Sequence, residues 1–324
     1  MTRIIAYRFS AFGDVAMTVP VFKEILEQNP NLEIIMVSRS SFKDAFNGFP
    51  RLIFKGINVD DYKGFFGMKR LADEIHKEYN PDYVADLHDV IRSKILNRVF
   101  KNKGYKVFKL NKGKEEKENL TDIHNIDKKP LKRTIERYAD VFREMGFPLT
   151  LHEKLVPLHK DKNGVGIAPF AQHQGKILPL EKTFELARII SRNHKIYFFG
   201  GGKKEVEILT KWEKLIPNSE NLAGKLTLKE ELEKISGLKV MVSMDSANMH
   251  LASLVGTRCV SVWGATHPHA GFLGYGQSEE DAVQINDLSC RPCSVFGDKE
   301  CYRGDYACLE ELSVQMIIDK INRQ

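Results

Sequence analysis

Several features that would assign a chain to a particular class of protein are absent from this sequence of 324 residues. No apolar run approaches the ~20 residues that a membrane-spanning helix needs. The N-terminus does not resemble a secretory signal, because its apolar stretch is short, is interrupted by Arg8 and precedes no small-residue cleavage site. Together with a mean hydropathy of −0.33, these absences predict a cytoplasmic protein without a membrane span.

The short motifs of the commonest nucleotide and metal sites are missing as well. There is no G-x-G-x-x-G fingerprint, and no D-x-D pair at the end of a predicted strand, so we expect no cofactor for catalysis. In their place stands RFSAFGDVAMTVP, residues 8–20, between a short apolar run and a helical pattern. A strand, a tight turn and a helix begin a mononucleotide-binding unit. Here, however, Gly13 is followed by Asp14, a carboxylate that would repel phosphate.

Short β-rich runs alternate with helical patterns along the whole chain. This alternation predicts an α/β fold with parallel sheets covered by helices on both faces. We predict two doubly wound domains, over residues 1–155 and 160–324, facing a central cleft and joined by a polar linker at residues 151–164. The predicted strands cover residues 3–7, 33–38, 83–86 and 106–110 in the first half, and 165–168, 195–199, 239–243 and 258–263 in the second.

The net charge of +6 is concentrated in one segment. Residues 101–133 hold eleven Lys or Arg against five Asp or Glu, so the rest of the chain is neutral overall. Such a run fits a plain solvated surface, and equally a patch for lipid head groups or for acidic or phosphorylated sugars. Because it matches no nucleic-acid reading motif, we expect no nucleic acid among the partners.

The strongest local pattern lies in the second half, at residues 239–276. A buried strand ends in Asp245 and Ser246, where a helix of small residues begins. Either side chain can cap that helix, and the exposed amides of its first turn, with His250 one turn on, would hold an anion. The next strand ends in a second turn, residues 264–268, and two such turns suit a diphosphate and its nucleoside. A third loop carries Lys176, which is either a surface lysine or a cation for phosphate oxygens.

Taken together, these segments resemble glycosyltransferase family 9, the bacterial ADP-heptose:lipopolysaccharide heptosyltransferases. The first stretch resembles the family motif R-x-S-x-x-G-D-x-x-x-T-x-P at Arg8, Ser10, Gly13, Asp14, Thr18 and Pro20. Residues 245–253 resemble D-[ST]-x-x-x-H-L-x-A, with Ser253 at the final small position, and residues 264–268 resemble G-x-T-x-P. Residues 83–93 and 222–225 resemble two further segments of the family.

The resemblance implies a GT-B fold, in which two Rossmann-like domains carry the acceptor on the first and the nucleotide-sugar donor on the second. It implies an inverting, metal-independent transfer of a heptose or related sugar, with ADP-heptose the favoured donor and a lipopolysaccharide core or lipid A–Kdo glycolipid the anionic acceptor. It further implies a monomer that associates peripherally with the cytoplasmic surface of the inner membrane.

The same resemblance assigns roles to residues of this chain. Asp14 would be the general base, and Lys176 would neutralise the departing diphosphate. The expected donor-binding residues are Ser10, Gly13, Asp245, Ser246, Ala247, Asn248, Met249, His250, Gly264, Thr266 and Pro268. The expected acceptor-binding residues are Arg8, Arg92 and Arg133.

Departures from the family pattern leave alternatives open. Residues 176–179 keep the lysine of a frequent K-x-W-P motif but lack its tryptophan, and Lys229 occupies the position of an acidic residue near the ribose. The sugar and base of the donor are therefore undecided. A nucleotide-sugar epimerase of the same fold is one alternative, and a non-catalytic nucleotide-sugar binding protein is another, although Asp14 and Lys176 argue against the latter.

Four of the five cysteines are clustered near the C-terminus as C-x2-C-x7-C-x6-C, at Cys290, Cys293, Cys301 and Cys308. In a cytosolic protein such a cluster points to zinc before disulfides. The spacing after the first pair is tighter than in common zinc ribbons. A structural zinc site and a loop packed by reduced thiols therefore stand as equal expectations.

Overall fold

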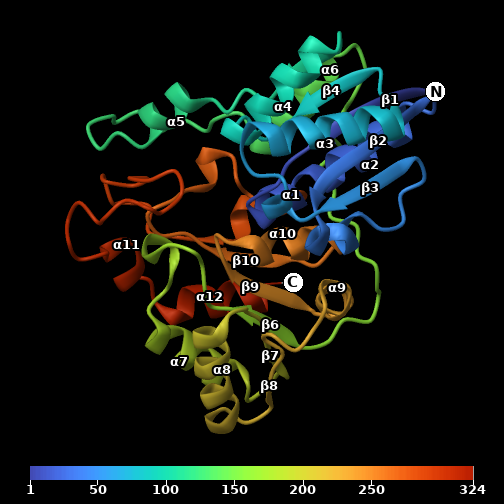
Figure 1. Cartoon of the computed structure of the whole chain (residues 1–324). Helices are drawn as coiled ribbons and strands as arrows, with labels where there is room; N and C mark the ends of the chain where they lie inside the picture. Colours follow the sequence, from blue (N-terminus) through green and yellow to red (C-terminus); the bar gives the residue numbers. More distant parts are fainter. Residues whose placement is uncertain (324) are drawn as a thin grey trace. The chain divides into compact units, whose positions relative to one another are not determined.

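Five parallel strands form the sheet of the first unit in the computed structural model, which describes residues 1–323. The unit comprises Met1–Lys112 and Thr134–His152, and its strand order is β3-β2-β1-β4-β5 (Figure 1). The strands are β1 (Thr2–Tyr7), β2 (Leu32–Arg39), β3 (Leu52–Ile57), β4 (Tyr83–Asp86) and β5 (Lys106–Lys109). The helices are α1 (Phe12–Ala16), α2 (Thr18–Gln28), α3 (Gly64–Tyr79), α4 (Ile91–Asn102) and α6 (Thr134–Glu144), with the 3₁₀ turns η1 (Ser40–Phe46) and η2 (Val59–Asp61).

The central strands β1 and β2 are apolar along most of their length because helices cover both faces of the sheet. After β1 the chain moves to β2 on one side, whereas β4 leads to β5 on the other. The strand order therefore reverses direction between β1 and β4. At such a switch point the loops after the two strands diverge onto opposite faces and leave room for a ligand.

The helical pattern after β1 is interrupted once. The apolar pattern of residues 15–28 predicts one continuous helix, but α1 ends at Ala16 and α2 begins at Thr18. Pro20 explains the break, because its ring would clash with the carbonyl of residue 16 in a continuous helix. The Thr18 hydroxyl donates to the Val15 carbonyl at 2.7 Å and closes the short helix. The break confines Asp14 to a single turn at the sheet edge.

The second unit comprises Gly113–Arg133 and the chain from Glu153 onward, and its sheet has six parallel strands in the order β11-β10-β9-β6-β7-β8. They are β6 (Val165–Ala168), β7 (Ile196–Phe198), β8 (Ser219–Asn221), β9 (Val240–Met244), β10 (Cys259–Val262) and β11 (Ala282–Val283). The helices are α5 (Lys114–Leu120), α7 (Leu180–Ile190), α8 (Lys203–Leu215), α9 (Leu228–Ser236), α10 (Ala247–Leu254), α11 (Ala307–Glu310) and α12 (Val314–Asn322). The 3₁₀ turns are η3 (Gln174–Lys176), η4 (Pro268–Ala270) and η5 (Glu279–Asp281). Its switch point lies between β6 and β9.

One segment belongs to a different unit from the one expected. Residues 113–133 lie inside the range predicted for the first domain, yet they pack on the second unit. The Leu131 amide donates to the His269 carbonyl at 2.9 Å, and the Lys117 ammonium lies 4.4 Å from the centre of the Phe272 ring. These contacts join segments that are far apart in sequence, which is why composition and periodicity gave no sign of them.

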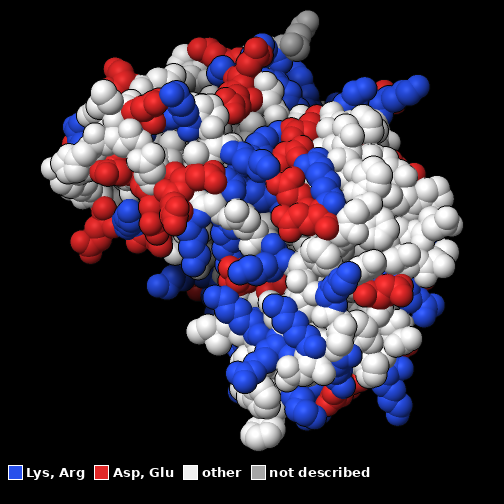
Figure 2. Space-filling model, turned by 90° about the horizontal axis from the view of Figure 1, so that it is seen from above, with Lys and Arg blue, Asp and Glu red and all other residues white. Residues whose placement is uncertain are grey.

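Because residues 113–133 belong to the second unit, the basic segment of residues 101–133 is divided between the two units. Residues 101–112, in the first unit, carry five Lys and no Asp or Glu, whereas residues 113–133 carry six basic and five acidic side chains. Figure 2 shows Lys and Arg interspersed with Asp and Glu over much of one face. The positive surplus of the segment therefore belongs almost entirely to the end of α4 and to β5.

All eight strands expected from the sequence are present, with bounds shifted by at most one residue. Three further strands were not expected, namely β3, β8 and β11. Each is an edge strand, and each is short, polar or partly exposed, so it lacks the apolar run of a central strand. Among residues 1–323, no helix combines the length and the apolar character that crossing a bilayer requires.

Candidate active site

Asp14 lies at the switch point of the first unit, in the single turn of α1 that follows β1. Its side chain is 24% exposed and forms an ion pair with Arg8, the distance from Oδ2 to Nη2 being 2.7 Å. Arg8 is buried, donates from Nη1 to the Leu87 carbonyl at 2.6 Å and lies over the ring of Tyr138. Arg8 thus orients the Asp14 carboxylate from the protein side, while Asp14 itself keeps an open face.

His88, which no sequence motif marks, is a neighbour of this site. It follows β4 across the switch point, is buried, and its Nε2 lies 3.5 Å from the hydroxyl of Ser10. Burial, with smaller contributions from Arg8 and Lys112, lowers the pKa of His88 to about 3, so the ring is neutral at physiological pH. Asp86 fixes the loop, because its carboxylate accepts from the amides of His88 and Asp89 at 2.9 and 2.8 Å.

The depressed pKa of His88 makes a prediction about pH and stability. An unfolded His88 binds a proton near pH 6.5, whereas the folded one resists protonation down to about pH 3. The folded state therefore loses stability as the pH falls below about 6.5, by about 1.4 kcal/mol per pH unit for this group. We expect H88Q to reduce the loss between about pH 7.5 and about pH 5 by about 2 kcal/mol, measured by urea unfolding at both pH values. H124Q, at an exposed histidine, serves as the control, and an unchanged pH dependence in H88Q would contradict the assignment.

Lys176 and Asp245 meet at the switch point of the second unit. Lys176 ends η3 in the loop after β6, and Asp245 follows β9, the neighbouring strand. The ammonium lies 3.0 Å from Oδ2 of Asp245, with side-chain exposures of 16% and 6%. The two expected residues are therefore in direct contact. The carboxylate holds the lysine at the strand ends, where a phosphate could approach its remaining hydrogens.

The N-terminus of α10 is the second part of this edge. Ser246 is its N-cap residue, but its hydroxyl lies 3.1 Å from that of Ser243 and makes no capping bond to the helix. The amides of Ala247, Asn248 and Met249 form the first turn, and His250 is buried behind them. Because the helix N-terminus carries partial positive charge, this turn is suited to an anion.

The turn after β10 is held against the Lys176 loop. The amide of Ala265 donates to the Gly175 carbonyl at 2.8 Å. Gly264 is required there, since a Cβ atom would lie 2.5 Å from that carbonyl oxygen. Thr266 and Pro268, the other residues expected in this turn, are buried. The three segments predicted from the sequence therefore lie together at one sheet edge.

Arg291 anchors this turn from behind and was not expected from the sequence. It is buried and donates to the carbonyls of Trp263, Gly264 and Thr266 at 3.2, 2.6 and 2.9 Å. A buried guanidinium needs such acceptors to offset its lost hydration. No sequence motif marks Arg291, because its partners lie 25 to 28 positions earlier in the chain.

Two of the residues expected to bind the acceptor, Arg92 and Arg133, lie in different units. Arg92 is half-buried in the first turn of α4, beside the loop of His88. Arg133 belongs to the second unit, where it is paired with Glu153 and donates to the carbonyls of Leu273 and Gly274 at 3.0 Å each. Ser10 and Gly13, expected to bind the donor, lie in the first unit beside His88 and Asp14 respectively.

The four clustered cysteines line one small cavity of about 10 Å³, together with Arg291 and Tyr306. All four thiols are free, and burial, reinforced by neighbouring thiols, raises the pKa of Cys293. Within the part of the chain that the structure describes, no set of three or more His, Cys, Asp or Glu side chains is arranged to hold a metal ion. The amide of Cys293 donates to the Ala265 carbonyl at 3.1 Å, which ties the cysteine loop to the turn after β10.

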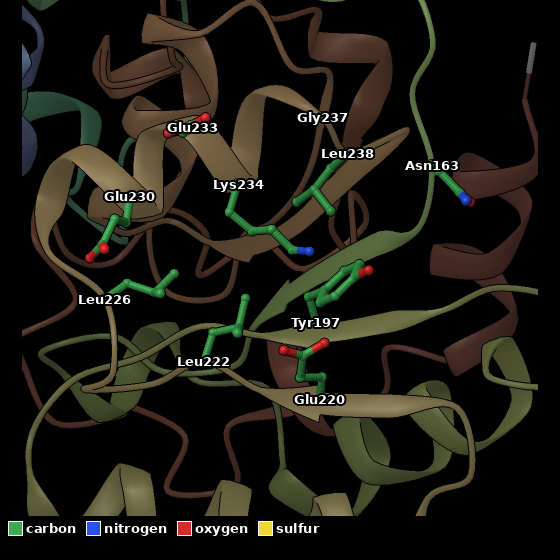
Figure 3. A pocket seen from close by; sticks show the side chains of 10 residues that line it. All are labelled: Asn163, Tyr197, Glu220, Leu222, Leu226, Glu230, Glu233, Lys234, Gly237 and Leu238. Atoms are coloured by element: carbon green, nitrogen blue, oxygen red, sulfur yellow. The ribbon is translucent and has the colours of Figure 1, made fainter.

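A larger cavity, of about 540 Å³, lies elsewhere in the second unit, between α9 and strands β7 and β8 (Figure 3). The ammonium of Lys234 reaches over the ring of Tyr197, 3.5 Å from its centre. The lining residues are Asn163, Tyr197, Glu220, Leu222, Leu226, Glu230, Glu233, Lys234, Gly237 and Leu238. None of the residues predicted to bind the donor lines this cavity.

The chain is similar to known proteins over most of its length. Residues 68–302 match the family model described as glycosyltransferase family 9 (heptosyltransferase). The chain is 23% identical to a lipooligosaccharide heptosyltransferase 2 from Campylobacter jejuni, over 96% of this chain and 95% of that protein.

Solved structures share its fold. One is a glycosyl transferase family 9 protein from Veillonella parvula, at 17% identity and a TM-score of 0.74, covering 98% of this chain and 96% of that one. Another is the ADP-heptose LPS heptosyltransferase II of Escherichia coli, at 17% identity and a TM-score of 0.70, covering 99% and 98% of the two chains. The expected GT-B class, with two Rossmann-like domains, is confirmed.

Proposed function

The chain belongs to glycosyltransferase family 9, the heptosyltransferases, and we propose that it transfers a heptose by direct displacement with inversion, Asp14 acting as the base. The acceptor hydroxyl oxygen attacks the anomeric carbon, and its proton passes to the Asp14 carboxylate. The bond from the anomeric carbon to the diphosphate oxygen breaks, and the nucleoside diphosphate departs. One displacement inverts the configuration and needs no protein nucleophile.

The single observation that carries this proposal is the pairing of Lys176 with Asp245 at the switch point of the second unit. The contact places a fixed cation next to the N-terminal turn of α10, and both can stabilise the negative charge that develops on the leaving diphosphate. Asp14 occupies the corresponding place in the first unit, where a carboxylate would repel phosphate but can accept a proton. The protein thus supplies base and charge stabilisation from its own side chains and amides, without a metal ion.

For the substrates, we propose ADP-heptose as donor and an anionic glycolipid of the lipopolysaccharide core as acceptor. The names of the relatives, a lipooligosaccharide heptosyltransferase 2 and an ADP-heptose LPS heptosyltransferase, support both. Because such an acceptor is anchored in a bilayer, we propose that the protein acts at the cytoplasmic face of the inner membrane. We also propose that it acts as a monomer.

The deciding experiment incubates the protein with ADP-, GDP- and UDP-sugars, with and without a lipid A–Kdo acceptor, and follows nucleotide release. We expect release from ADP-heptose that depends on the acceptor. Release from another donor alone would overturn the donor assignment, whereas release of free sugar or of an epimerised donor without acceptor would favour the epimerase. Binding without any turnover would favour the non-catalytic protein.

A structural zinc ion on Cys290, Cys293, Cys301 and Cys308 is a separate part of the proposal. It is supported by the C-x2-C pair and by the convergence of the four thiols on one cavity, although their arrangement would have to tighten to reach Zn–S distances of about 2.3 Å. We expect about one equivalent of zinc by elemental analysis of protein purified without chelator, and its loss with a lower Tm in C290S/C293S. Metal-free protein with an unchanged Tm in that variant would leave reduced thiols as the explanation.

A further inference from the structure

Three apolar side chains of the first unit are exposed at the starts of two adjacent helices. Phe65 and Phe66, in the first turn of α3, are 48% and 83% exposed, and Ile91, the first residue of α4, is 79% exposed. Helices α3 and α4 pack side by side. Both run back from the carboxyl edge of the same parallel sheet, so their N-termini lie at that edge. This is also the edge at which Asp14 follows β1.

The two phenylalanines lie next to each other in a closely packed first turn of α3. The two rings contact each other edge to face, with centroids 5.7 Å apart. Gly67, one residue on, lies so close to the backbone of Tyr62 that a Cβ atom would be 2.3 Å from the Tyr62 carbonyl carbon. The first turn of α3 therefore packs closely against the segment that precedes it.

Basic residues are close in sequence to the three apolar ones or lie at the same edge of the sheet. Residues 60–70, 89–94 and 109–112 carry seven Lys or Arg against three Asp or Glu. Lys63, Lys69, Lys94 and Lys109 among them are exposed. Lys69 and Lys94 also form ion pairs, with Asp73 at 3.0 Å and Asp89 at 3.8 Å, and these pairs would have to exchange for lipid phosphates. We call Phe65, Phe66 and Ile91 with these four lysines the edge patch. Exposed apolar side chains flanked by cations are the combination that binds an anionic bilayer interface.

We propose that the edge patch docks the first unit on an anionic lipid bilayer, with Phe65, Phe66 and Ile91 entering the interface and the lysines meeting lipid phosphates. The proposal rests on the proposed function in one respect, namely that the acceptor is a glycolipid, since docking at this edge brings the Asp14 side of the sheet to the acceptor's membrane. A second copy of the chain is a poorer occupant. Three apolar side chains fall short of the ~800 Å² per partner of a stable interface, and a two-fold axis would set lysine against lysine.

Co-sedimentation with vesicles tests the proposal. Vesicles of phosphatidylcholine alone are compared with vesicles that also contain phosphatidylglycerol, using the full chain, F65S/F66S, I91S and the control L215S. Leu215 is 66% exposed on the second unit and is the matched control. We expect the wild type to prefer the anionic vesicles about tenfold, F65S/F66S to lose about tenfold in binding, I91S to lose less, and added salt to weaken binding. L215S should bind as the wild type does.

Unchanged binding by both F65S/F66S and I91S, or no preference for anionic lipid, would overturn the proposal. So would light scattering that showed a wild-type dimer and a monomeric F65S/F66S, because the patch would then be an interface between copies. Turnover with a delipidated acceptor should be equal in the wild type and F65S/F66S. If no donor is turned over while the vesicle results hold, the proposed function fails and the docking surface stands.

Discussion

Replacing Asp14 by Asn is expected to reduce sugar transfer by roughly 10²–10⁴-fold, the usual contribution of a general base. The amide has the same shape as the carboxylate and can still accept a hydrogen bond from Arg8, which pairs with Asp14 at 2.7 Å. It cannot take the proton of the acceptor hydroxyl. Donor affinity should stay within a few-fold, because Lys176 and all the candidate donor residues except Ser10 and Gly13 belong to the second unit. Nucleotide release and donor titration measure the two effects separately.

The matched control for D14N is D89N. Asp89 is also a partly buried carboxylate at the carboxyl edge of the first sheet, and it too has a cationic partner, Lys94 at 3.8 Å. Transfer should be little affected in this variant. If D14N kept transfer within tenfold of the wild type with an unchanged Tm, the base would have to be another group, and His88, neutral and next to Ser10, would be the first to examine.

Replacing Lys176 by Met is expected to lower transfer by roughly 10²–10³-fold through lost stabilisation of the leaving diphosphate. The same change leaves the buried carboxylate of Asp245 without its cation, so the second unit should also lose stability, by roughly 3–5 kcal/mol. A fall in Tm alone would explain low activity, and the single variant therefore cannot separate the two effects.

The double variant K176M/D245N separates them. Replacing the carboxylate by an amide removes the buried charge, so the Tm should return toward that of the wild type. Transfer should stay low, because the cation that meets the diphosphate is still missing. Recovery of transfer together with the Tm would mean that Lys176 serves only to neutralise Asp245, and the catalytic role assigned to it would be wrong.

Local patterns were sufficient for much of the fold. The strand over residues 83–86 and the strand over residues 165–168 were predicted with their observed bounds, because buried parallel strands are short continuous apolar runs. Strand β8, with the sequence Ser-Glu-Asn, was missed for the converse reason. It lies at the sheet edge, where one pairing partner suffices and the side chains remain partly exposed.

In the candidate site, too, some features follow from local sequence and others depend on the fold. The turn of Asp14, the loop of Lys176 and the start of α10 could each be recognised locally, since each joins a strand to a helix or turn. The contact between Lys176 and Asp245 could not be recognised locally. It depends on the pairing of β6 with β9, in which Val165 lies opposite Val240, 75 positions further along the chain. His88 and Arg291 were missed because their roles come from partners that are distant in sequence.

The sequence by itself determined which residues are available for chemistry: a carboxylate in the first turn, a lysine and a helix start in the second half, and the family motif that links them. These are properties of consecutive residues, in which strand, turn and helix preferences act over a few positions. Only the tertiary structure decided which of them meet. The strand order brought Lys176 to Asp245 and His88 to Ser10, and residues 113–133 pack on the second unit, where Arg133 pairs with Glu153. The physical reason is that strand pairing and side-chain burial are long-range interactions, which no stretch of neighbouring residues encodes alone.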